Sequence, residues 1–387
     1  MTPLSEPWQS RAEGVIQERQ AQDLLRRRRC VEFTSPRTLI CDGRTYLQFA
    51  SNDYLGLAFD DGELTSLSPE RTESARRRGA GGSALICGYQ PAHQRLEQAL
   101  CEATGFEAAL LFSSGFAANA APFALCRAGD RILADKLVHA SVVDGAQASE
   151  ASLRRFPHND MATLTRWLEA SDSPTMVVSE SVFSMDGDQA PMADLVALCR
   201  RHGALSWLDD AHGFGVIGKH GLGASELARP DLLTITFGKA LGASGAALLG
   251  SRGLIEAILQ SARHYIFSTA MPVDLADHLV FQLKRAAQPG PRQHLADLIA
   301  HFRRGARAQG WSLLDSETPI QPLVLGGSDA ALALSAALEA EGIWCPAIRP
   351  PTVPRGQARL RIVFNAGHRA EDVDRLLTAL AVLGSKP

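Results

Sequence analysis

The sequence lacks any apolar run long enough to span a membrane. A transmembrane helix needs about 20 consecutive apolar residues, and no stretch of the 387 residues approaches that length. The N-terminal residues, MTPLSEPWQSRAEG, also lack the basic and then apolar pattern of a signal peptide. We therefore expect a cytoplasmic protein.

Paired cysteines are also lacking. The seven cysteines are odd in number and scattered along the chain, and no two of them form a C-x-x-C pair. This distribution argues against a disulfide framework and favours reduced thiols. No cluster of His, Cys, Asp and Glu has the spacing of metal ligands, so we expect no bound metal.

The chain has little excess charge of either sign. Its formal net charge of -3 gives no reason to expect nucleic acid or an anionic membrane as a partner. A length of 387 residues exceeds the roughly 250 residues that one core usually serves. We expect an N-terminal arm with a helix and a hairpin (1–50), a large domain (51–285) and a smaller C-terminal α/β domain (286–387).

The arm contains two recognisable patterns. Residues 8–29 predict an amphipathic helix that ends in four consecutive arginines, at positions 26–29. The segment from Thr38 to Phe49 predicts a hairpin, because Asp42-Gly43 separates two apolar runs and suits a type I′ turn.

Between residues 91 and 250, helical patterns alternate with short apolar runs. The runs begin near residues 131, 175, 204, 232 and 246, and the helices are expected at 91–104, 115–126, 140–150, 160–170 and 191–202. Continuous apolar strands, each followed by a helix, predict a mainly parallel sheet buried on both faces. Such a doubly wound α/β domain binds ligands at the carboxyl ends of its strands.

The region after Pro272 predicts helices as far as about residue 310. Strands are then expected near residues 320, 343 and 359, with helices at 329–341 and 370–383. This pattern is typical of a smaller α/β domain.

Polar residues follow two of the predicted strands at the edge where ligands are expected. Asp209 and His212 come after the strand at 204–208. A carboxylate opposite a pyridine nitrogen keeps that nitrogen protonated, and a protonated pyridine ring is the electron sink of pyridoxal phosphate (PLP). A surface acid and a packing histidine are the simpler alternative for these two residues.

Lys239 follows the strand at 232–236 and stands next to Gly238. Partial burial there would lower its pKa and favour the neutral amine that a Schiff base requires. Thr236, three residues earlier, can donate to a phosphate. The alternative is an exposed lysine in a turn.

Three further segments supply groups for a flat anionic ligand. Gly115 and Phe116 open an alanine-rich helix, where free backbone N–H groups can bind phosphate. His139 follows the strand near 131 and can stack on a ring, while Ser184 follows the strand near 175 in the same way.

Two short motifs have to be rejected. Residues 213–218 match G-x-G-x-x-G, but glycine-rich sequence follows them in place of an amphipathic helix, so a nicotinamide site is not indicated. Gly238-Lys239 precedes Ala240 and lacks the upstream glycine of a phosphate-binding P-loop.

Seven ordered motifs resemble those of the α-oxoamine synthases, fold-type I PLP enzymes that join an amino acid to an acyl-CoA with loss of CO₂. The similarity runs from about residue 10 to the C-terminus. The motifs are SNDYLGL (51–57), GYQPAHQRLE (88–97), LFSSGFAAN (111–119), VFSMDGD (182–188), DDAHGFGVIG (209–218), FGKALGASGAA (237–247) and FSTAMP (267–272).

The resemblance implies a set of coenzyme contacts. Lys239 would carry PLP as a Schiff base, Asp209 would face the pyridine nitrogen, and His212 would bond the phenolic oxygen. His139 would stack on the ring, and it joins Lys239 and Asp209 in the catalytic set. The residues expected against the phosphate and the ring edge are Gly115, Phe116, Thr236 and Ser184.

The resemblance also implies the substrates. RRFPHND (154–160), IQPLVLG (320–326) and AIRPPTVPRGQARLRI (347–362) are most similar to the family member that condenses L-alanine with a pimeloyl thioester in biotin biosynthesis. Arg361 would hold the carboxylate of the amino acid beside His139, while Arg26 and Thr352 would contact the acyl substrate, carried by CoA or a carrier protein. The site would lie at a homodimer interface, across which FSTAMP would reach.

The chain departs from the family pattern at a few positions. Phe214 stands where the family usually has a small or hydroxyl residue, Phe267 replaces a common tyrosine, and Ala84-Leu85 alter a glycine-rich loop. These departures bear on acyl-chain preference. The alternatives are a sister enzyme that uses glycine with acetyl-CoA, and a non-catalytic partner subunit, which would be expected to lack the Schiff-base lysine.

Overall fold

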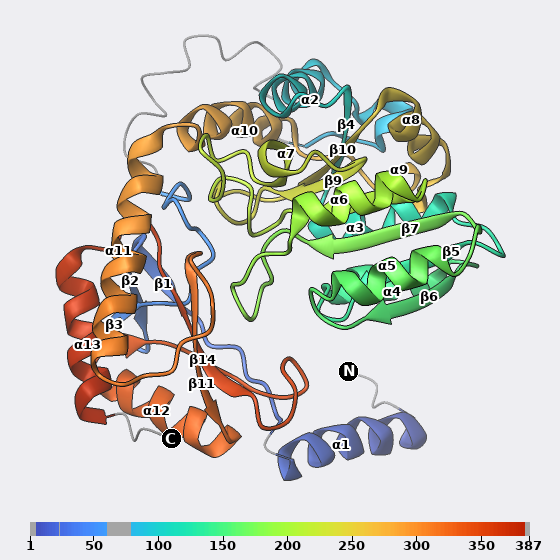
Figure 1. The fold of residues 1–387 in the computed structure, drawn as a ribbon. Helices are drawn as coiled ribbons and strands as arrows, with labels where there is room; N and C mark the ends of the chain where they lie inside the picture. The colour runs from blue at the N-terminus through green and yellow to red at the C-terminus, as the bar shows by residue number, and fades with distance from the viewer. Residues whose placement is uncertain (1–4, 23, 60–78, 384–387) are drawn as a thin grey trace.

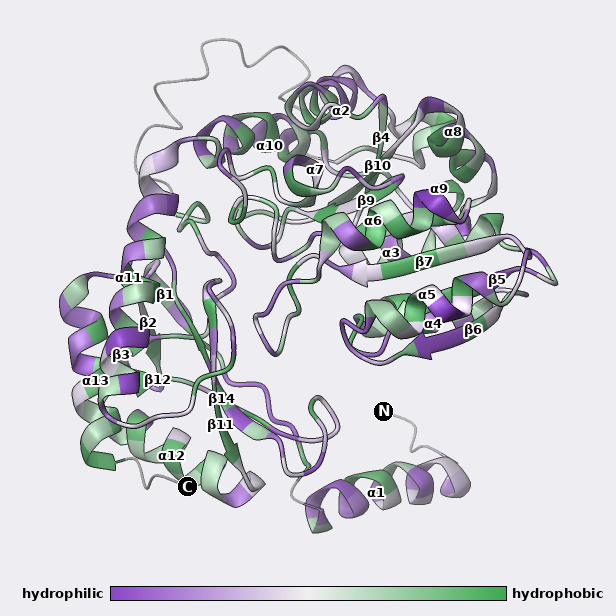
Figure 2. Ribbon diagram, in the orientation of Figure 1, coloured by the Kyte–Doolittle hydropathy of each residue, from purple (hydrophilic) through white to green (hydrophobic). Residues whose placement is uncertain are grey.

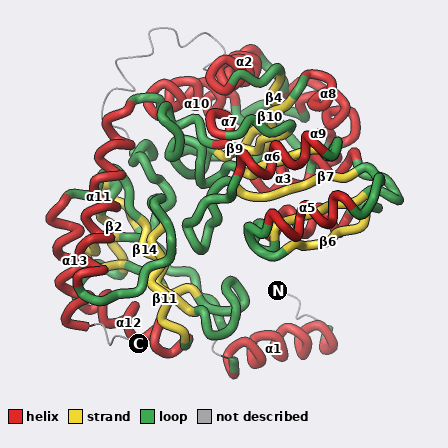
Figure 3. Tube along the Cα trace, viewed as in Figure 1, coloured by secondary structure: helices red, strands yellow, loops and turns green. Residues whose placement is uncertain are grey.

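The structure is a computed structural model that describes residues 5–22, 24–59 and 79–383. Two groups of strands, each with its covering helices, lie side by side and are called here the large layer and the second layer. The N-terminal helix stands apart from both (Figure 1). Helices cover the strands of both layers, and loops join them at the surface (Figure 3).

The N-terminal helix is shorter than the sequence predicts. Helix α1 spans Glu6–Ala21 and buries none of its residues, so the four arginines at 26–29 follow the helix. Arg29 pairs with Asp42 at 3.1 Å and Glu339 at 2.7 Å, so the arginine segment follows the surface of the protein and does not continue the helix. Residue 23 of the predicted helix lies outside the described residues.

The predicted hairpin is confirmed. Strand β2 (Thr38–Cys41) pairs with β3 (Arg44–Gln48), and Asp42 and Gly43 have φ values of 50° and 75°. Two successive positive φ values are what a type I′ turn requires. Strand β1 (Glu32–Ser35) extends this sheet on one side, and the short strand β12 (Ile343–Trp344) extends it on the other.

The large layer contains the predicted doubly wound sheet. Its seven strands lie in the order β4-β10-β9-β8-β7-β5-β6, and β10 is antiparallel to both of its neighbours while the remaining pairs are parallel. The strands are β4 (Ala108–Phe112), β5 (Arg131–Asp135), β6 (Ser152–Phe156), β7 (Thr175–Glu180), β8 (Leu205–Asp209), β9 (Leu232–Thr236) and β10 (Ala246–Gly250).

Alternate residues of these strands enter two different hydrophobic cores. Val177 belongs to one core and Val178 to the other, and neither is accessible to solvent. The sheet is therefore buried on both faces, as its continuous apolar runs predict. The central strand β7 is mostly hydrophobic, whereas the edge strand β6 is hydrophilic (Figure 2).

Helices pack on both sides of this sheet. The helix predicted at 115–126 ends early at Ala120, because Pro122 has no N–H to donate and opens a separate 3₁₀ turn, Pro122–Leu125. The helices of this layer are α2 (Pro91–Thr104), α3 (Gly115–Ala120), α4 (Ala140–Ala148), α5 (Met161–Glu169), α6 (Met192–Arg201), α7 (Ala224–Leu227), α8 (Arg252–Ser261), α9 (Arg263–Ile266) and α10 (Val273–Ala286), and a π-helical turn spans Ala84–Gly88.

The second layer has an antiparallel sheet in the order β11-β14-β13. The strand expected near residue 343 is in fact two short strands in different sheets, separated at Cys345-Pro346. The elements are α11 (Pro289–Ala308), β11 (Ile320–Gly326), α12 (Ser328–Ala340), β13 (Ala347–Ile348), β14 (Ala358–Val363) and α13 (Ala370–Leu383). The division of the chain at residues 50 and 285 stays a prediction.

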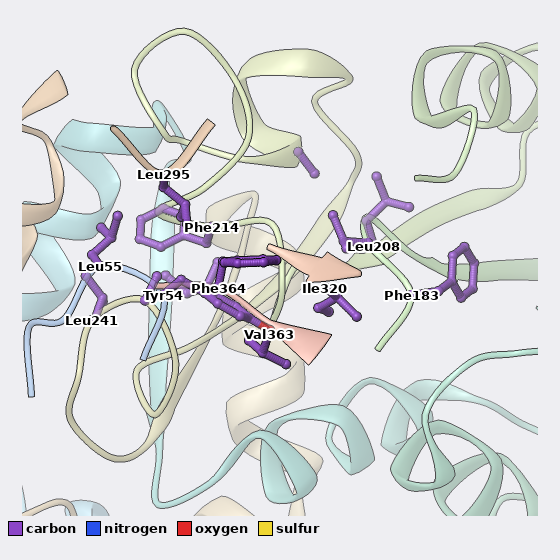
Figure 4. Packing of buried hydrophobic residues seen from close by; sticks show 14 of the residues in the cluster. Tyr54, Leu55, Phe183, Leu208, Phe214, Leu241, Leu295, Ile320, Val363 and Phe364 are labelled. Carbon is purple, nitrogen blue, oxygen red and sulfur yellow. The ribbon is translucent and has the colours of Figure 1, made fainter. Parts of the chain in front are cut away.

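Phe214, one of the departures from the family pattern, is a core residue. It is 4% exposed and belongs to the same buried cluster as Leu55, Leu241 and Leu295 (Figure 4). Since Leu295 comes from α11, this aromatic ring lies in a cluster to which both layers contribute. Its size therefore serves packing.

The loop between β7 and α6, residues 181–191, joins the two layers. The Thr318 hydroxyl, from the second layer, donates to the Gly187 carbonyl oxygen at 2.9 Å. Gly187 has a φ of 73°, and an added Cβ would collide with the Ile320 carbonyl oxygen and with Ser316 Oγ. A glycine is needed here for its backbone conformation and for its lack of a side chain.

We expect Gly187→Ala to destabilise the protein by at least about 3 kcal/mol, because left-handed backbone costs about 1–2 kcal/mol and the collision adds to it. Gly43→Ala is the matched control, since Gly43 has a similar φ of 75° but open space around it. Thermal unfolding of both variants should show the larger fall in melting temperature for Gly187→Ala. Equal falls would contradict the proposed close contact.

Candidate active site

A cavity of ≈ 310 Å³ opens at the carboxyl ends of β4, β8 and β9. This is the edge of a doubly wound sheet where ligands bind. Six residues singled out from the sequence line the cavity together: Gly115, Phe116, His139, Asp209, Thr236 and Lys239.

Asp209 is the last residue of β8 and is 5% exposed. Its Oδ2 accepts a hydrogen bond from Asn119 Nδ2 at 2.6 Å, and its Oδ1 accepts one from the Ala211 backbone N–H at 3.0 Å. With one donor on each oxygen, the side chain is held in a single orientation beside the cavity.

The same network reaches His139, the N-cap residue of α4. Asn119 Nδ2 also donates to Ser141 Oγ at 3.0 Å, and Ser141 Oγ lies 2.8 Å from His139 Nδ1. The Ser141 backbone N–H donates to that Nδ1 at 3.3 Å, so Nδ1 is the unprotonated ring nitrogen. One chain of contacts thus fixes the carboxylate and the imidazole that face the cavity.

Lys239 follows β9 after a two-residue turn, and its Nζ lies 2.7 Å from His212 Nε2. Burial lowers the pKa of Lys239 to about 8, and the negative charges of Asp209 and Glu180 oppose this shift. A substantial fraction of the amine is therefore neutral near physiological pH, as a nucleophilic lysine requires.

A second network connects Lys239 with Arg361 on β14. The hydroxyl of Tyr54 lies 2.5 Å from His212 Nδ1 and 3.3 Å from Asn52 Oδ1, which accepts from Arg361 Nη1 at 3.0 Å. Arg361 Nε donates to the Ser184 carbonyl oxygen at 2.6 Å, so two oxygens fix the plane of the guanidinium.

Tyr54 controls which nitrogen of His212 carries a proton. Burial, followed by the positive charges of Lys239 and Arg361, lowers the pKa of His212 well below its usual value, so the ring is neutral. Burial also raises the pKa of Tyr54 to about 12, which keeps its hydroxyl protonated. Tyr54 has a single proton, which it donates either to Asn52 Oδ1 or to His212 Nδ1. When it donates to Nδ1, the His212 proton resides on Nε2 and can be donated toward the ligand.

The other predicted residues are not among those that line the cavity: His212, Arg361, Ser184, Arg26 and Thr352. Ser184 contributes its backbone carbonyl to Arg361. Arg26 and Thr352 are brought together, with Nη2 and Oγ1 3.4 Å apart, and both are exposed. Neither is among the described residues that line the cavity.

Sequence reasoning missed three residues of the site: Tyr54, Asn119 and Glu180. Tyr54 and Asn119 lie in the motifs SNDYLGL and LFSSGFAAN, but nothing in their spacing indicates contact with His212 or Asp209. Glu180 ends β7 directly beside Asp209 and is buried. The one sequence signal for Glu180 was its position as a carboxylate at the end of a predicted buried strand.

The described residues offer no group of three His, Cys, Asp or Glu side chains that could hold a metal ion. Within the same part of the chain, every helix is too short or too polar to cross a membrane.

Comparison with known proteins gives consistent results. Residues 44–380 match the family described as aminotransferase class I and II. The 8-amino-7-oxononanoate synthase of Salmonella paratyphi B is 46% identical over 380 residues, which cover 96% of this chain and 98% of the relative. The Salmonella typhimurium enzyme of the same name is 45% identical with the same coverage.

Solved structures are similar over nearly the whole chain. Serine palmitoyltransferase from Sphingomonas wittichii is 28% identical with a TM-score of 0.87, covering 99% of this chain and 98% of that one. A structure of SPT with a PLP internal aldimine is 27% identical with a TM-score of 0.89, covering 97% and 98%. The 8-amino-7-oxononanoate synthase of Francisella tularensis is 27% identical with a TM-score of 0.74, covering 87% and 97%.

We expect the acylation rate of Lys239 in the coenzyme-free protein to rise with pH, with a midpoint near pH 8. An unperturbed lysine would have a midpoint at 10.5. The midpoint is lowered because the reactive neutral amine predominates above the lowered pKa. Competitive labelling read by mass spectrometry measures this, with Lys284 as the internal standard for labelling yield. Asp209→Asn should lower the midpoint further, because it removes a charge that stabilises the ammonium.

Asp172→Asn, an exposed substitution on the loop before β7, is the matched control and should leave the midpoint of Lys239 unchanged. A midpoint near pH 10 in the unmodified protein would contradict the burial argument.

Proposed function

The chain belongs to the family of class I and II aminotransferases and, within it, to the 8-amino-7-oxononanoate synthases, and from this we propose that it condenses L-alanine with a pimeloyl thioester. The products are 8-amino-7-oxononanoate, CO₂ and the free thiol, in a step of biotin biosynthesis. One observation carries the proposal: a partly buried lysine and a buried carboxylate line one cavity, and a hydrogen-bonded chain connects that lysine with Arg361.

The cavity suits PLP, the coenzyme of this family. An added Cβ on Gly115 would lie 2.7 Å from Thr236 Cγ2, so the backbone of α3 and the Thr236 side chain meet at the closest approach that a glycine allows. The hydroxyls of Ser114, Thr236 and Ser244 line the same cavity and can donate to phosphate oxygens. When bound, PLP supplies an electron-withdrawing ring that stabilises negative charge at the α-carbon of an attached amino acid.

We assign the coenzyme contacts as follows. Lys239 is the point of attachment, Asp209 holds a proton on the pyridine nitrogen, and His139 stacks on the ring. Neutral His212 faces the phenolic oxygen through Nε2, which carries the His212 proton when Tyr54 donates its own single proton to Nδ1. The residues against the phosphate and the ring edge are Gly115, Phe116, Thr236 and Ser184.

Lys239 also transfers the proton in this proposal. Once the amino acid has taken its place, the free amine removes the proton from the α-carbon of alanine. The lowered pKa of Lys239, about 8, supports this role because a base with a pKa near the working pH is the most effective.

Arg361 binds the carboxylate of alanine. Its planar guanidinium can form two parallel hydrogen bonds to a carboxylate, and the bonds to Ser184 and Asn52 fix that plane in advance. A fixed carboxylate also orients the Cα–H bond relative to the ring, which raises the rate without any new chemical group. Arg26 and Thr352 are assigned to the acyl substrate, whose carrier is CoA or a carrier protein.

We further propose that the active protein is a homodimer. We also propose that it is cytoplasmic, as the sequence predicts. Phe116 lines the cavity and is 47% exposed, while Ile86 and Phe267 are 82% and 70% exposed. The segments of Ile86 and Phe267 are connected by the bridge between Ser83 and Thr269. So much exposed apolar surface supports burial against a second copy.

The proposed reaction is tested by a product assay. Purified protein is incubated with L-alanine and pimeloyl-CoA or a pimeloyl carrier protein, and mass spectrometry detects 8-amino-7-oxononanoate. Glycine with acetyl-CoA is the parallel reaction. Turnover only on glycine and acetyl-CoA would assign the chain to the sister ligase, and no turnover on either pair would refute the proposal.

We expect Lys239→Ala to reduce kcat by at least about three orders of magnitude and to abolish the visible absorbance of bound coenzyme, because attachment and proton transfer are lost together. Lys219→Ala, at an exposed position on another loop, is the control and should leave both properties unchanged. A visible coenzyme band retained in Lys239→Ala would contradict the assignment of Lys239 as the point of attachment.

We expect the double substitution Ile86→Asp and Phe267→Asp to convert a dimer into monomers, because two carboxylates cannot be buried unpaired in an apolar interface. Sedimentation equilibrium measures the mass. Val382→Asp, which places the same charge on a 78% exposed apolar residue of α13, should leave the mass unchanged.

A further inference from the structure

His158, a histidine that the proposed chemistry does not use, lies between two carboxylates at the carboxyl end of the large sheet. Its Nδ1 is 3.0 Å from Asp135 Oδ1, and its Nε2 is 2.8 Å from Asp188 Oδ2. Asp135 is the last residue of β5 and is fully buried, while Asp188 belongs to the β7–α6 loop. His158 thus connects the ends of two neighbouring strands.

The geometry requires an imidazolium. Both ring nitrogens face carboxylate oxygens, which only accept hydrogen bonds, so both nitrogens must donate. Burial lowers the pKa of His158, but the hydrogen bonds to Asp135 and Asp188 outweigh it and raise the pKa to about 10. A positive charge between two negative ones is therefore the state present at neutral pH.

The next residue, Asn159, donates hydrogen bonds to the same two carboxylates. The Asn159 backbone N–H donates to Asp135 Oδ2 at 2.8 Å, and Asn159 Nδ2 donates to Asp188 Oδ2 at 3.0 Å. Asn159 has a φ of 54°, a conformation that asparagine tolerates better than most residues. His158 and Asn159 together hold one side of the β7–α6 loop.

The opposite side of this loop contacts the strand that carries Arg361. The Ser184 carbonyl accepts from Arg361 Nε at 2.6 Å, and Asp186 forms an ion pair with Arg359, two residues earlier on β14. Three residues separate Ser184 from Asp188, and the bridge between Val182 and Gln189 closes the loop. A shift at Asp188 is therefore transmitted to Ser184 within one tight turn.

We propose that His158 is a positioning residue for the amino-acid substrate. Its imidazolium fixes the β7–α6 loop, the loop places the Ser184 carbonyl, and that carbonyl orients the guanidinium of Arg361 toward the carboxylate of alanine. The inference rests on the proposed function of Arg361 and adds the residues that determine its orientation.

The main test is His158→Gln in the holoenzyme. Glutamine carries no charge, and both of its N–H donors are on one nitrogen, so it cannot span the two carboxylates as the imidazolium does. Asp135 and Asp188 then repel each other and the loop shifts. We expect the KM for alanine to rise about tenfold or more, since small displacements of a binding group have effects of this size. The KM for the acyl thioester should stay the same, and kcat should change much less.

The double variant His158→Gln with Asp188→Asn separates positioning from general damage. Removing the second carboxylate's charge removes the repulsion, so the KM for alanine should return part of the way to the unmodified value. If His158→Gln does not fold, Asp188→Ala at its partly exposed position must raise the KM for alanine with the KM for the thioester unchanged.

His301→Gln is the matched control. It breaks another histidine–aspartate pair, His301 with Asp374 at 2.7 Å, which lies between α11 and α13. It should leave both KM values unchanged. An unmodified protein that does not turn over alanine refutes the proposed function, whereas normal turnover with the same alanine KM in His158→Gln and in Asp188→Ala refutes this inference alone.

Discussion

The placement of one amine and two carboxyl groups at the same edge of the sheet is the constraint on which the rest of the site depends. Lys239, Asp209 and Glu180 all lie at the carboxyl ends of neighbouring strands. Burial and the nearby charge of Asp209 raise the pKa of Glu180 well above its usual value, while the same burial lowers the pKa of Lys239. Removing Asp209 would take away the charge that most stabilises the Lys239 ammonium. The sheet can keep these groups together because parallel strands end at one edge.

Two hydrogen-bonded chains extend from this centre and have different tasks. One runs from Asp209 through Asn119 to His139 and stays within the large layer. The other runs from Lys239 through Tyr54 to Arg361 and crosses to the second layer. Asp209 and His139 are therefore oriented within the large layer, whereas Arg361, the residue proposed to bind the amino acid, is joined to Lys239 and His212 by a chain that crosses between the layers. That difference explains why so many polar bonds gather on the β7–α6 loop.

Sequence patterns predicted the parts of the site that follow strands. Asp209, His212 and Lys239 come directly after apolar runs, so the topology alone brings them to one edge. Tyr54 and His158 act through contacts with distant segments, and no local spacing reveals such contacts. Strands β4 and β6 were missed for a related reason: β4 is alanine-rich and reads as a helix, and the edge strand β6 contains Arg154 and Arg155. The predicted first helix was too long because Arg26 and Arg29 contact distant segments, and no local pattern reveals those contacts.

The pairing of β3 with β12 has a consequence for the order in which the protein is made. Leu47 is aligned with Ile343, so the hairpin near the N-terminus is completed by a strand synthesised almost at the end. At ribosomal rates the edge of β3 stays uncovered for tens of seconds. Uncovered strand edges pair readily with other chains. The nascent polypeptide thus passes through a period in which it needs protection from its neighbours, and that period ends only when β12 leaves the ribosome.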